Sequence, residues 1–171
     1  MILEIDFPED QETCCAGINI RPYLVEMLTE ASQCMQVVVF TASHQTYADA
    51  ILDYIDPQNQ YFTHRLYRQN CVLTPEGYFV KDLRVIRNRQ LKDVVLVDNS
   101  VYSFAYQVDN GIPIISFYDN PQDEELLHLI YYIKGLRECD DCRAQNRKAF
   151  ELYKIGHKNS SLDLDATTGF L

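Results

Sequence analysis

Three short apolar runs, rich in β-branched residues, constrain the possible fold of this chain more than any other feature. They cover residues 36–41, 93–97 and 112–117, and each has the length of a strand. None approaches the roughly 20 residues that a membrane-spanning helix requires. Runs without alternating polar residues are typical of strands covered on both faces, as in a parallel sheet. The sequence therefore predicts an α/β fold in which these strands are buried on both faces.

Segments with helical periodicity separate the apolar runs. We expect helices that begin at Pro22, pass through residues 47–54 and span residues 123–136. Strands that alternate with helices predict a mostly parallel, Rossmann-like sheet flanked by helices. Residues 1–6 predict one strand of a hairpin with a turn at residues 8–11, and residues 61–81 predict a small β insertion around the turn Pro75-Glu76-Gly77. We expect one domain over residues 1–153 and a polar, flexible tail over residues 154–171.

Charge and cysteine content narrow the classes of function. The net charge is -10, from 15 basic and 25 acidic residues, which argues against direct nucleic-acid binding because such binding needs cations that displace phosphate counterions. One basic stretch, residues 81–92, leaves room for a local anion site. Six cysteines without a secretory signal indicate a reduced, intracellular compartment. We interpret the pair Cys139 and Cys142 as the end of a helix rather than a metal or redox site.

Polar clusters follow two of the predicted strands, at the sheet edge where ligands of parallel α/β folds bind. Thr41 and Ser43 could hold a phosphate with the backbone N–H groups of the next helix, although hydroxyl residues are also favoured there as helix N-caps, and spacing alone favours the cap. Asp98 and Asn99 supply oxygen ligands suited to Mg²⁺, but a simple turn would favour the same residues. Lys81 alone would be taken for a surface lysine, and beside a phosphate it would offset developing negative charge.

Taken together, the motifs of this chain resemble those of a known enzyme family. Phe40-Thr-Ala-Ser43, Arg65-Leu-Tyr-Arg68, Val80-Lys-Asp-Leu83 and Val97-Asp-Asn-Ser100 follow one another in the order and approximate spacing of the small phosphatases that act on the C-terminal tail of RNA polymerase II. The resemblance extends from about Ile18 to Leu136. It implies the haloacid-dehalogenase fold and a phosphoprotein phosphatase of the Ser/Thr class that uses Mg²⁺ and an aspartyl-phosphate intermediate. Its partner would be a phosphorylated protein or peptide, and its compartment the nucleus.

The resemblance also implies a role for each matching position. The catalytic positions would be Thr41, which binds the transferring phosphoryl group, and Lys81, which stabilises phosphate charge and the nucleophile. Asp98 and Asn99 would hold Mg²⁺. Substrate would be bound by Ser43, Tyr47 and Arg68.

One departure from the family concerns the nucleophile. Members begin with an apolar strand that ends in Asp-x-Asp-x-Thr and lies in the centre of the sheet, and residues 1–21 contain no such motif. We expect a complete gene product to carry that strand before residue 1. Without it, strand edges should remain unpaired and apolar surface uncovered. The segment Asp163-Leu-Asp165-Ala-Thr167 fits the motif, and a circular permutation would make Asp163 the nucleophile and Asp165 the acid. We favour a chance match in an acidic tail, because residues 156–161 are too polar for a central strand.

A second interpretation needs no turnover. Some relatives keep this fold for protein contacts, so the chain could be a catalytically inactive module that binds proteins or phosphopeptides through Thr41, Tyr47, Arg68 and Lys81. The presence of Lys81 and of Asp98-Asn99 favours the enzyme, because packing requires neither.

Overall fold

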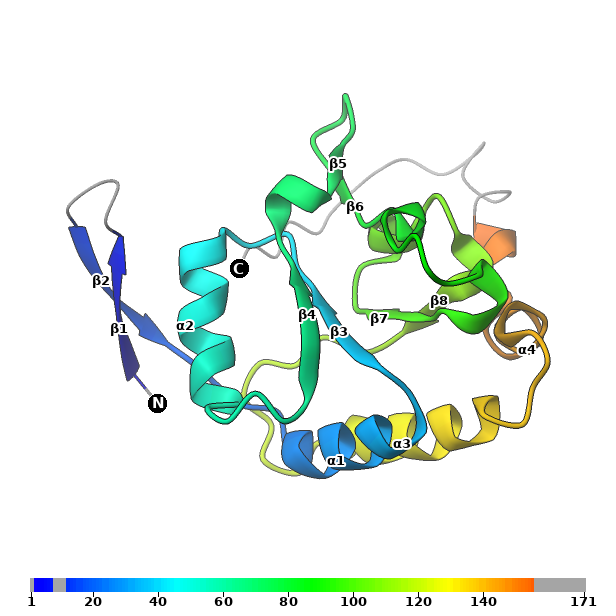
Figure 1. The fold of residues 1–171 in the computed structure, drawn as a ribbon, viewed down its shortest axis with the longest axis horizontal. Coiled ribbons are helices and arrows are strands. Elements are labelled where there is room, and N and C mark those ends of the chain that lie inside the picture. Colours follow the sequence, from blue (N-terminus) through cyan, green and yellow to red (C-terminus); the bar gives the residue numbers. More distant parts are fainter. Residues whose placement is uncertain (1, 8–11, 156–171) are drawn as a thin grey trace.

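The computed structural model describes residues 2–7 and 12–155. Its elements alternate strands and helices over most of the chain, as Figure 1 shows. The strands are β1 (Ile2–Phe7), β2 (Glu12–Gly17), β3 (Val37–Phe40), β4 (Phe62–Leu66), β5 (Val72–Leu73), β6 (Phe79–Val80), β7 (Leu96–Asp98) and β8 (Gly111–Pro113). The α-helices are α1 (Leu24–Cys34), α2 (Gln45–Ile55), α3 (Glu125–Leu136) and α4 (Cys142–Phe150).

The central strands form two parallel pairs. Strand β3 pairs with β4, and β7 pairs with β8, so the predicted α/β class with parallel strands is confirmed. Within the described residues, no ladder joins β3 to β7, and the two pairs are separate half-sheets. Their inner strands face each other across a gap in the ribbon (Figure 1). Among residues 2–7 and 12–155, the inner edges of β3 and β7 therefore have no ladder partner.

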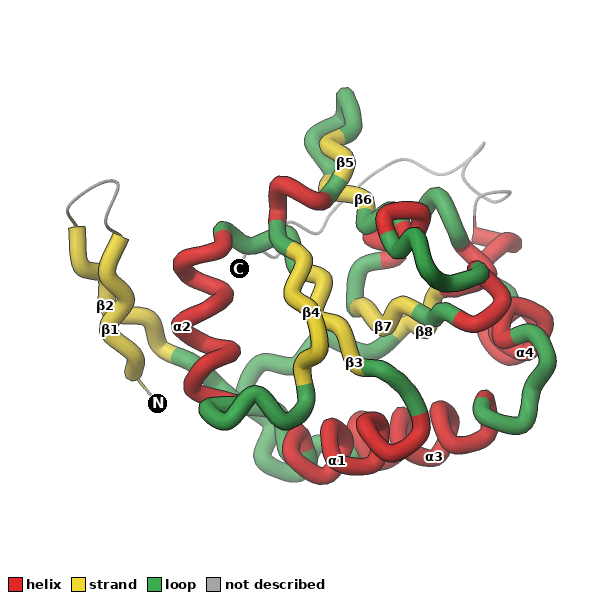
Figure 2. Tube along the Cα trace, viewed as in Figure 1, coloured by secondary structure: helices red, strands yellow, loops and turns green. Residues whose placement is uncertain are grey.

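Helices α1 and α3 pack side by side along one face of both half-sheets (Figure 2). Their contact forms the larger hydrophobic core, which contains Ala31 of α1 and Ile133 of α3. Val37 of β3 and Val97 of β7 pack against the same cluster, so the helices connect the two half-sheets. Arg21 reinforces this connection, because its guanidinium Nε donates to the Asp123 carboxylate at 2.7 Å, 102 residues along the chain.

A smaller core lies beside β7 and β8. It contains Leu83, Leu96 and Phe104, and the Phe104 side chain is 1% exposed. The Phe104 ring lies directly over the backbone of Gly111, where an added Cβ would come within 2.6 Å of ring carbons. Glycine is therefore required at this position by close approach.

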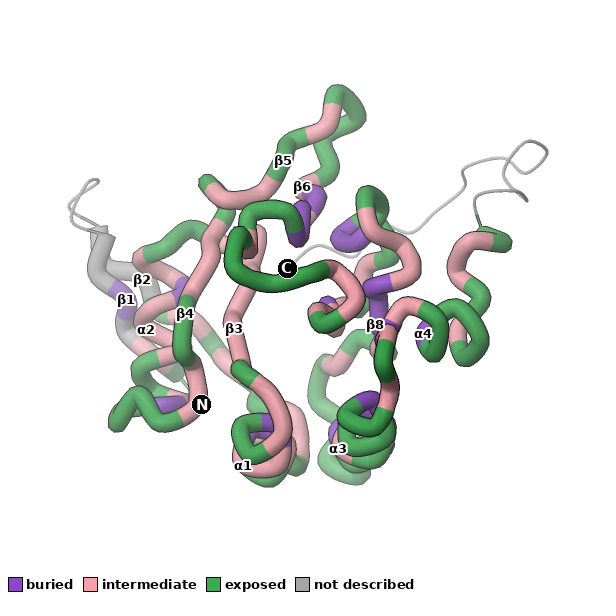
Figure 3. Tube along the Cα trace, turned by 45° about the vertical axis from the view of Figure 1, so that its right-hand side comes forward, coloured by how far each residue is buried: buried purple, intermediate pink, exposed green. Residues whose placement is uncertain are grey.

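Strand β3 corrects one expectation about burial. All of its residues are half-buried, as Figure 3 shows, although the sequence predicts a strand buried on both faces. The prediction was wrong because burial depends on what lies beside the strand, and in the described part of the chain the inner edge of β3 borders a cavity rather than another strand.

Several element boundaries also differ from the prediction. Helix α1 begins at Leu24 rather than Pro22, because Tyr23 adopts a left-handed conformation with φ 63°. Strand β8 ends at Pro113, and β7 begins at Leu96 because Leu91–Asp93 forms a 3-10 turn. The small β insertion predicted over residues 61–81 is confirmed in part. Strands β5 and β6 pair around Gly77, whose φ of +91° suits glycine, whereas residues 62–66 form β4 of the parallel pair with β3.

The N-terminal hairpin is confirmed as the antiparallel pair β1 and β2, with β1 packed on α2. Its turn at residues 8–11 lies outside the described residues, as do residues 156–171 with Asp163 and Asp165. The boundary expected at residue 153 stays a prediction. Among the described residues, no helix is long and apolar enough to cross a membrane.

Candidate active site

The carboxyl ends of β3, β4 and β7 meet at one edge of the half-sheets, beneath the β5–β6 insertion (Figure 1). Thr41 follows β3, Arg68 comes two residues after β4, and Asp98 ends β7. Lys81 follows β6 and enters the same region from the insertion. The fold thus brings four of the predicted site residues to the edge where ligands of parallel α/β sheets bind.

Thr41 is held by the neighbouring strand. Its backbone N–H donates to the Leu66 carbonyl at 2.9 Å, and its hydroxyl oxygen accepts from the Ser43 N–H at 3.0 Å. The N-cap of α2 is His44, which makes no side-chain capping bond. The capping interpretation of Thr41 and Ser43 is therefore wrong. The Thr41 hydroxyl instead shapes the turn that carries both hydroxyl residues to the helix.

Arg68 is fixed against the same turn. Its Nε donates to the Ala42 carbonyl at 2.7 Å, and its backbone N–H donates to the Ser43 carbonyl at 3.1 Å. The guanidinium carbon lies 5.3 Å from the centre of the Phe79 ring. The side chain is nevertheless exposed, so these contacts orient the cation without covering it.

Arg68 also lines an open cavity of about 690 Å³ at the start of α2. Tyr47, predicted to bind substrate, is half-buried on α2 and does not line this cavity. The sequence did not predict the other residues that line this cavity, because isolated polar side chains in a helix form no motif. Besides Arg68, the cavity is lined by His44, Gln45, Thr46, Asp49 and Gln69.

Lys81 and Asp98 form an ion pair from the Nζ atom to Oδ2. Both side chains are largely buried, 12% and 8% exposed. The Lys81 backbone N–H donates to the Ser103 carbonyl at 2.8 Å, and Asp98 Oδ1 accepts from the Ser100 N–H at 2.8 Å. The pair is therefore held from both ends, and each carboxylate oxygen of Asp98 already has a donor.

The loop that carries Lys81 is anchored by its neighbour Asp82. The buried Asp82 carboxylate accepts from the Arg84 side chain and from Gln107 Nε2 at 3.0 Å. The Arg84 hydrogen bond is the main cause that lowers the pKa of Asp82 to about 2. Gln107 Oε1 in turn accepts from the Leu83 N–H at 3.0 Å. This network fixes the backbone on the C-terminal side of Lys81.

Asn99 points to a different neighbourhood from Asp98. It is exposed, and its Nδ2 donates to the Ser116 hydroxyl at 3.0 Å. Asn99 and Ser116 line a cavity of about 330 Å³ that Arg21 also borders, whereas Asp98 does not line it. The oxygens of Asp98 and Asn99 suit a hard cation such as Mg²⁺, and they would supply two of its roughly six ligands. The donor types fit magnesium, but the two side chains have different partners in this structure, so Asn99 would have to turn toward Asp98 for both to bind one ion, and water, substrate or a further carboxylate would have to supply the remaining ligands.

Cys71 links the two parts of the site, a role that its sequence position did not indicate. Its thiol lies 3.7 Å from the Thr41 carbonyl, on the β3 side. Burial raises the pKa of this thiol, while the charges of Lys81 and Arg68 lower it and that of Asp98 raises it. Cys71 therefore contacts the turn that carries Thr41, and the charges of Arg68, Lys81 and Asp98 act on the pKa of its thiol.

The family model for NLI interacting factor-like phosphatases matches residues 1–143. The chain belongs to this family. The resemblance drawn from its motifs is thereby confirmed, and all four polar positions at the sheet edge lie inside the region that defines the NLI interacting factor-like phosphatases.

Curated relatives carry related names. The chain is 44% identical over 135 residues to "CTD small phosphatase-like protein 2" of Dictyostelium discoideum, covering 79% of this chain and 23% of the relative. It is 40% identical over 121 residues to the human "CTD small phosphatase-like protein", covering 71% and 43%. It is 37% identical over 126 residues to "Nuclear envelope morphology protein 1" of Schizosaccharomyces pombe, covering 74% and 26%. The chain thus spans less than half the length of these relatives.

Solved structures support the fold. The structure of Fcp1, described as an essential RNA polymerase II CTD phosphatase, superposes with a TM-score of 0.60 at 20% identity, covering 87% of this chain and 42% of Fcp1. The Fcp1-R271A protein from fission yeast, bound to beryllium fluoride, gives a TM-score of 0.60 at 19% identity. The predicted haloacid-dehalogenase-like fold is confirmed by this likeness.

Proposed function

We propose that this chain forms the core of a Mg²⁺-dependent phosphoprotein phosphatase that hydrolyses phosphate monoesters on protein tails, such as the C-terminal domain of RNA polymerase II. One observation carries the proposal. This chain belongs to a phosphatase family, and four polar residues lie at the edge of its parallel strands, where α/β folds bind ligands: Thr41, Arg68, Lys81 and Asp98. The relatives named as CTD small phosphatase-like proteins support the substrate class.

In this proposal each residue handles the phosphoryl group in its own way. The Thr41 hydroxyl and the nearby N–H groups donate to the phosphoryl oxygens. The Lys81 ammonium offsets the charge that develops on these oxygens in the transition state. Arg68 binds a second anionic group of the substrate with the guanidinium N–H groups that do not face Ala42. Asp98 and Asn99 would hold Mg²⁺, which would draw negative charge away from the phosphate.

The nucleophile in this chemistry is a carboxylate. One of its oxygens forms a bond to phosphorus while the bond from phosphorus to the substrate oxygen breaks, and an acid protonates the leaving oxygen. Water then attacks phosphorus, releases inorganic phosphate and restores the carboxylate. Both carboxylate oxygens of Asp98 accept hydrogen bonds, from the Lys81 ammonium and the Ser100 N–H, so we do not assign Asp98 as the nucleophile. Asp163 and Asp165 lie outside the described residues, so their match to the nucleophile and acid positions of the motif stays a prediction.

The deciding experiment is hydrolysis of p-nitrophenyl phosphate by the 171-residue chain, with Mg²⁺ and with EDTA. Turnover that requires Mg²⁺ and disappears in Lys81→Met supports the proposal and makes Asp163 the next residue to replace. A folded chain without turnover, together with an N-terminally extended protein that also lacks it, would overturn the proposal.

A second candidate is a phosphopeptide-binding module without turnover. The orientation of Arg68 by Ala42 and Phe79 favours it, because that geometry exists without any nucleophile. The module would bind a phosphopeptide in EDTA and lose affinity in Arg68→Ala or Lys81→Met. Equal binding of phosphorylated and plain peptide would exclude this function.

We also propose a nuclear or nuclear-envelope location. It rests on the relatives named "Nuclear envelope morphology protein 1" and, from Danio rerio, "CTD nuclear envelope phosphatase 1B". Imaging of the tagged full-length protein would test it, and uniform exclusion from the nucleus would count against it.

A further inference from the structure

Two tyrosines stack on each other where the β5–β6 insertion meets the segment after β7. Tyr78 comes directly before β6, and Tyr102 lies in the 3-10 turn Val101–Phe104. Their ring centroids are 4.1 Å apart and the interplanar angle is 11°. Both residues are exposed, at 41% and 42%, and the insertion projects from the rest of the molecule (Figure 1). We call this pair, which presents aromatic surface to solvent, the tyrosine stack.

The turn that carries Tyr78 is held by its own hydrogen bonds. The Gly77 N–H donates to the Thr74 carbonyl at 3.0 Å, and the Thr74 N–H donates to the Tyr78 carbonyl at 2.9 Å. The Tyr78 N–H donates to the Thr74 hydroxyl at 3.2 Å. Glu76 is exposed on this turn, two residues before Tyr78. One hydrogen-bonded turn thus carries a carboxylate and an aromatic ring, so a ligand that binds both need not order the backbone.

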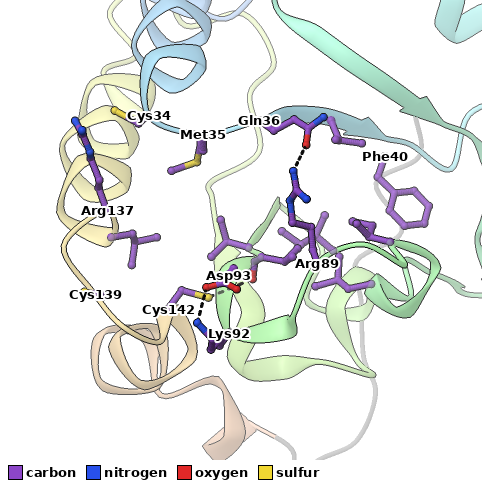
Figure 4. Close-up of a pocket in the computed structure, with 17 residues that line it drawn as sticks. Cys34, Met35, Gln36, Phe40, Arg89, Lys92, Asp93, Arg137, Cys139 and Cys142 are labelled. Carbon is purple, nitrogen blue, oxygen red and sulfur yellow. Dashed lines mark hydrogen bonds and ion pairs between the residues drawn. The ribbon is translucent and has the colours of Figure 1, made fainter.

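Other aromatic rings of this chain already carry a cation. An arginine lies over each of four rings, with 3.9 to 5.8 Å between the guanidinium carbon and the ring centre: Arg147 over Tyr153, Arg68 over Phe79, Arg21 over Phe117 and Arg84 over Tyr106. Arg89 lies in the cavity shown in Figure 4, where it donates to Gln36. Across residues 2–7 and 12–155, no cation lies over Tyr78 or Tyr102, and Glu76 forms no ion pair. The tyrosine stack and Glu76 therefore offer a place for a cation that comes from another molecule.

The chemistry of this place suits a guanidinium group. A planar guanidinium stacks on aromatic faces and pairs with carboxylates, and both kinds of group are present here. The net charge of -10 attracts basic segments of a partner. Lys81, by contrast, belongs to the proposed phosphate site. A partner with one basic and one phosphorylated residue would therefore meet a complementary charge for each.

Strand β6 sets the spacing between the tyrosine stack and the phosphate site. Lys81 follows Tyr78 by three residues, and its backbone N–H donates to the carbonyl of Ser103, the neighbour of Tyr102. An extended backbone advances about 3.3 Å per residue, so Tyr78 lies on the order of 10 Å from Lys81 along the chain. About three residues of an extended substrate cover the same distance.

We infer that the tyrosine stack and Glu76 bind the side chain of an arginine in a phosphorylated polypeptide, about three residues from its phosphorylated residue. The guanidinium would lie against an exposed tyrosine face while the Glu76 carboxylate accepts its N–H groups. These contacts would select among the substrates of the phosphatase site. The position of the phosphate rests on the proposed function, whereas recognition of the arginine does not.

Fluorescence anisotropy of the intact 171-residue chain, in EDTA and at fixed salt, tests the arginine preference. The probes are labelled alanine-based peptides with one phosphoserine and one arginine, which lies three residues before the phosphoserine in one peptide and three residues after it in the other. Each peptide has a control in which citrulline, neutral and similar in shape, replaces arginine. For at least one placement, the arginine peptide should bind about threefold to tenfold more tightly than its control. Equal affinity at both placements, or no binding of any peptide, would overturn the inference.

Variants separate the tyrosine stack from general attraction to an acidic protein. Tyr102→Leu and Glu76→Gln should each reduce the arginine preference to less than about twofold and leave the affinity for the citrulline peptides within about twofold. Tyr78→Phe keeps an aromatic face and should keep the preference. The matched controls, Tyr131→Leu on α3 and Glu138→Gln, change exposed residues elsewhere and should also keep it.

An arginine preference that survives both Tyr102→Leu and Glu76→Gln would overturn the inference. If Tyr102→Leu weakens the binding of every peptide because the insertion loosens, Glu76→Gln decides, since it changes only an exposed side chain of the turn.

Hydrolysis of p-nitrophenyl phosphate distinguishes this inference from the proposed function, because that compound contains no arginine. If the chain hydrolyses it with Mg²⁺ and shows no arginine preference, the proposed function stands and the arginine site fails. If unphosphorylated peptides show the same preference, lost in Glu76→Gln, while neither this chain nor an N-terminally extended protein hydrolyses the compound, the arginine site stands and the proposed function fails.

Discussion

Lys81 and Asp98, which lie 17 residues apart in the sequence, form a largely buried ion pair at the edge where the phosphatase site is proposed. The pair joins the β insertion to the end of β7, so it is structural as well as a candidate for chemistry. A stability measurement can separate these two contributions.

Lys81→Met removes the ammonium and leaves the Asp98 carboxylate without its ion partner. Because breaking a buried pair strands one charge, the free energy of unfolding should fall by about 3 kcal/mol in urea titrations. Adding Asp98→Asn should restore part of the loss, and additive losses would contradict the coupling. Lys92→Met is the control, because the pair of Lys92 with Asp93 is exposed and its removal should cost less than about 1 kcal/mol.

Arg68 should contribute to phosphopeptide affinity through its orientation as well as its charge. Arg68→Ala should weaken binding about tenfold or more, as expected for a charge-assisted hydrogen bond. Arg68→Lys keeps the charge but loses the planar group over Phe79 and the bond to Ala42, and it should recover a fraction of the affinity. Calorimetric titration at fixed salt measures both, and Arg87→Ala, at an exposed cation, should change little.

Asp82 should give the chain an acid-sensitive stability. Its pKa is lowered from 3.8 to about 2, chiefly by the Arg84 hydrogen bond. A carboxyl whose pKa is depressed on folding contributes stability that is complete above the unfolded pKa and is lost as the pH falls through the folded value. The urea midpoint should therefore drop between about pH 4 and pH 2.

The variant Asp82→Asn should lose this dependence and cost about 1–3 kcal/mol at neutral pH, because a buried acceptor site is altered. Asp119→Asn, at an exposed position, should keep the wild-type pH profile. A wild-type profile in Asp82→Asn would show that another group controls acid unfolding.

Gly111→Ala should be strongly destabilising, because its new Cβ would meet the Phe104 ring at 2.6 Å. Overpacking of this kind costs about 1–3 kcal/mol, and Phe104→Leu in the same chain should recover part of it. Gly135→Ala in α3 meets no atom within 4 Å and should raise the free energy of unfolding by about 0.5–1 kcal/mol. Thermal unfolding compares the variants, and equal melting temperatures for both alanine substitutions would refute the packing argument.

The sequence anticipated which polar residues lie at the sheet edge better than it anticipated where the helices and strands begin and end. Thr41 and Asp98 could be placed together because parallel strands end at one edge, and the motifs that resemble the family supplied Arg68 and Lys81. Cys71 was missed as the link between them, since a lone cysteine has no spacing signal. The orientation of Arg68 toward Ala42 arises from the turn after β3, which no local pattern in residues 61–81 encodes.

Where sequence rules failed, a competing physical effect explains the outcome. Pro22 suits the first turn of a helix, yet Tyr23 adopts a left-handed conformation and delays the start of α1. The hydroxyl residues at 41 and 43 suggested a cap, but the Thr41 oxygen is already used by the Ser43 N–H. The burial of β3 depends on what lies beside it in space, and its inner edge borders a cavity, so its own apolar residues could not predict its half-buried state.

The connection of the half-sheets by α1 and α3 has a kinetic consequence. Each half-sheet closes through local pairing, whereas the contact of α1 with α3 and the bond from Arg21 to Asp123 join segments 102 residues apart. Because long loops must close before such contacts form, we expect the half-sheets to form early and the helices to dock late. Ile133→Val should then mainly accelerate unfolding, and Val39→Ala should mainly slow folding. Stopped-flow chevron measurements test this order of events, and slower folding of Ile133→Val would contradict it.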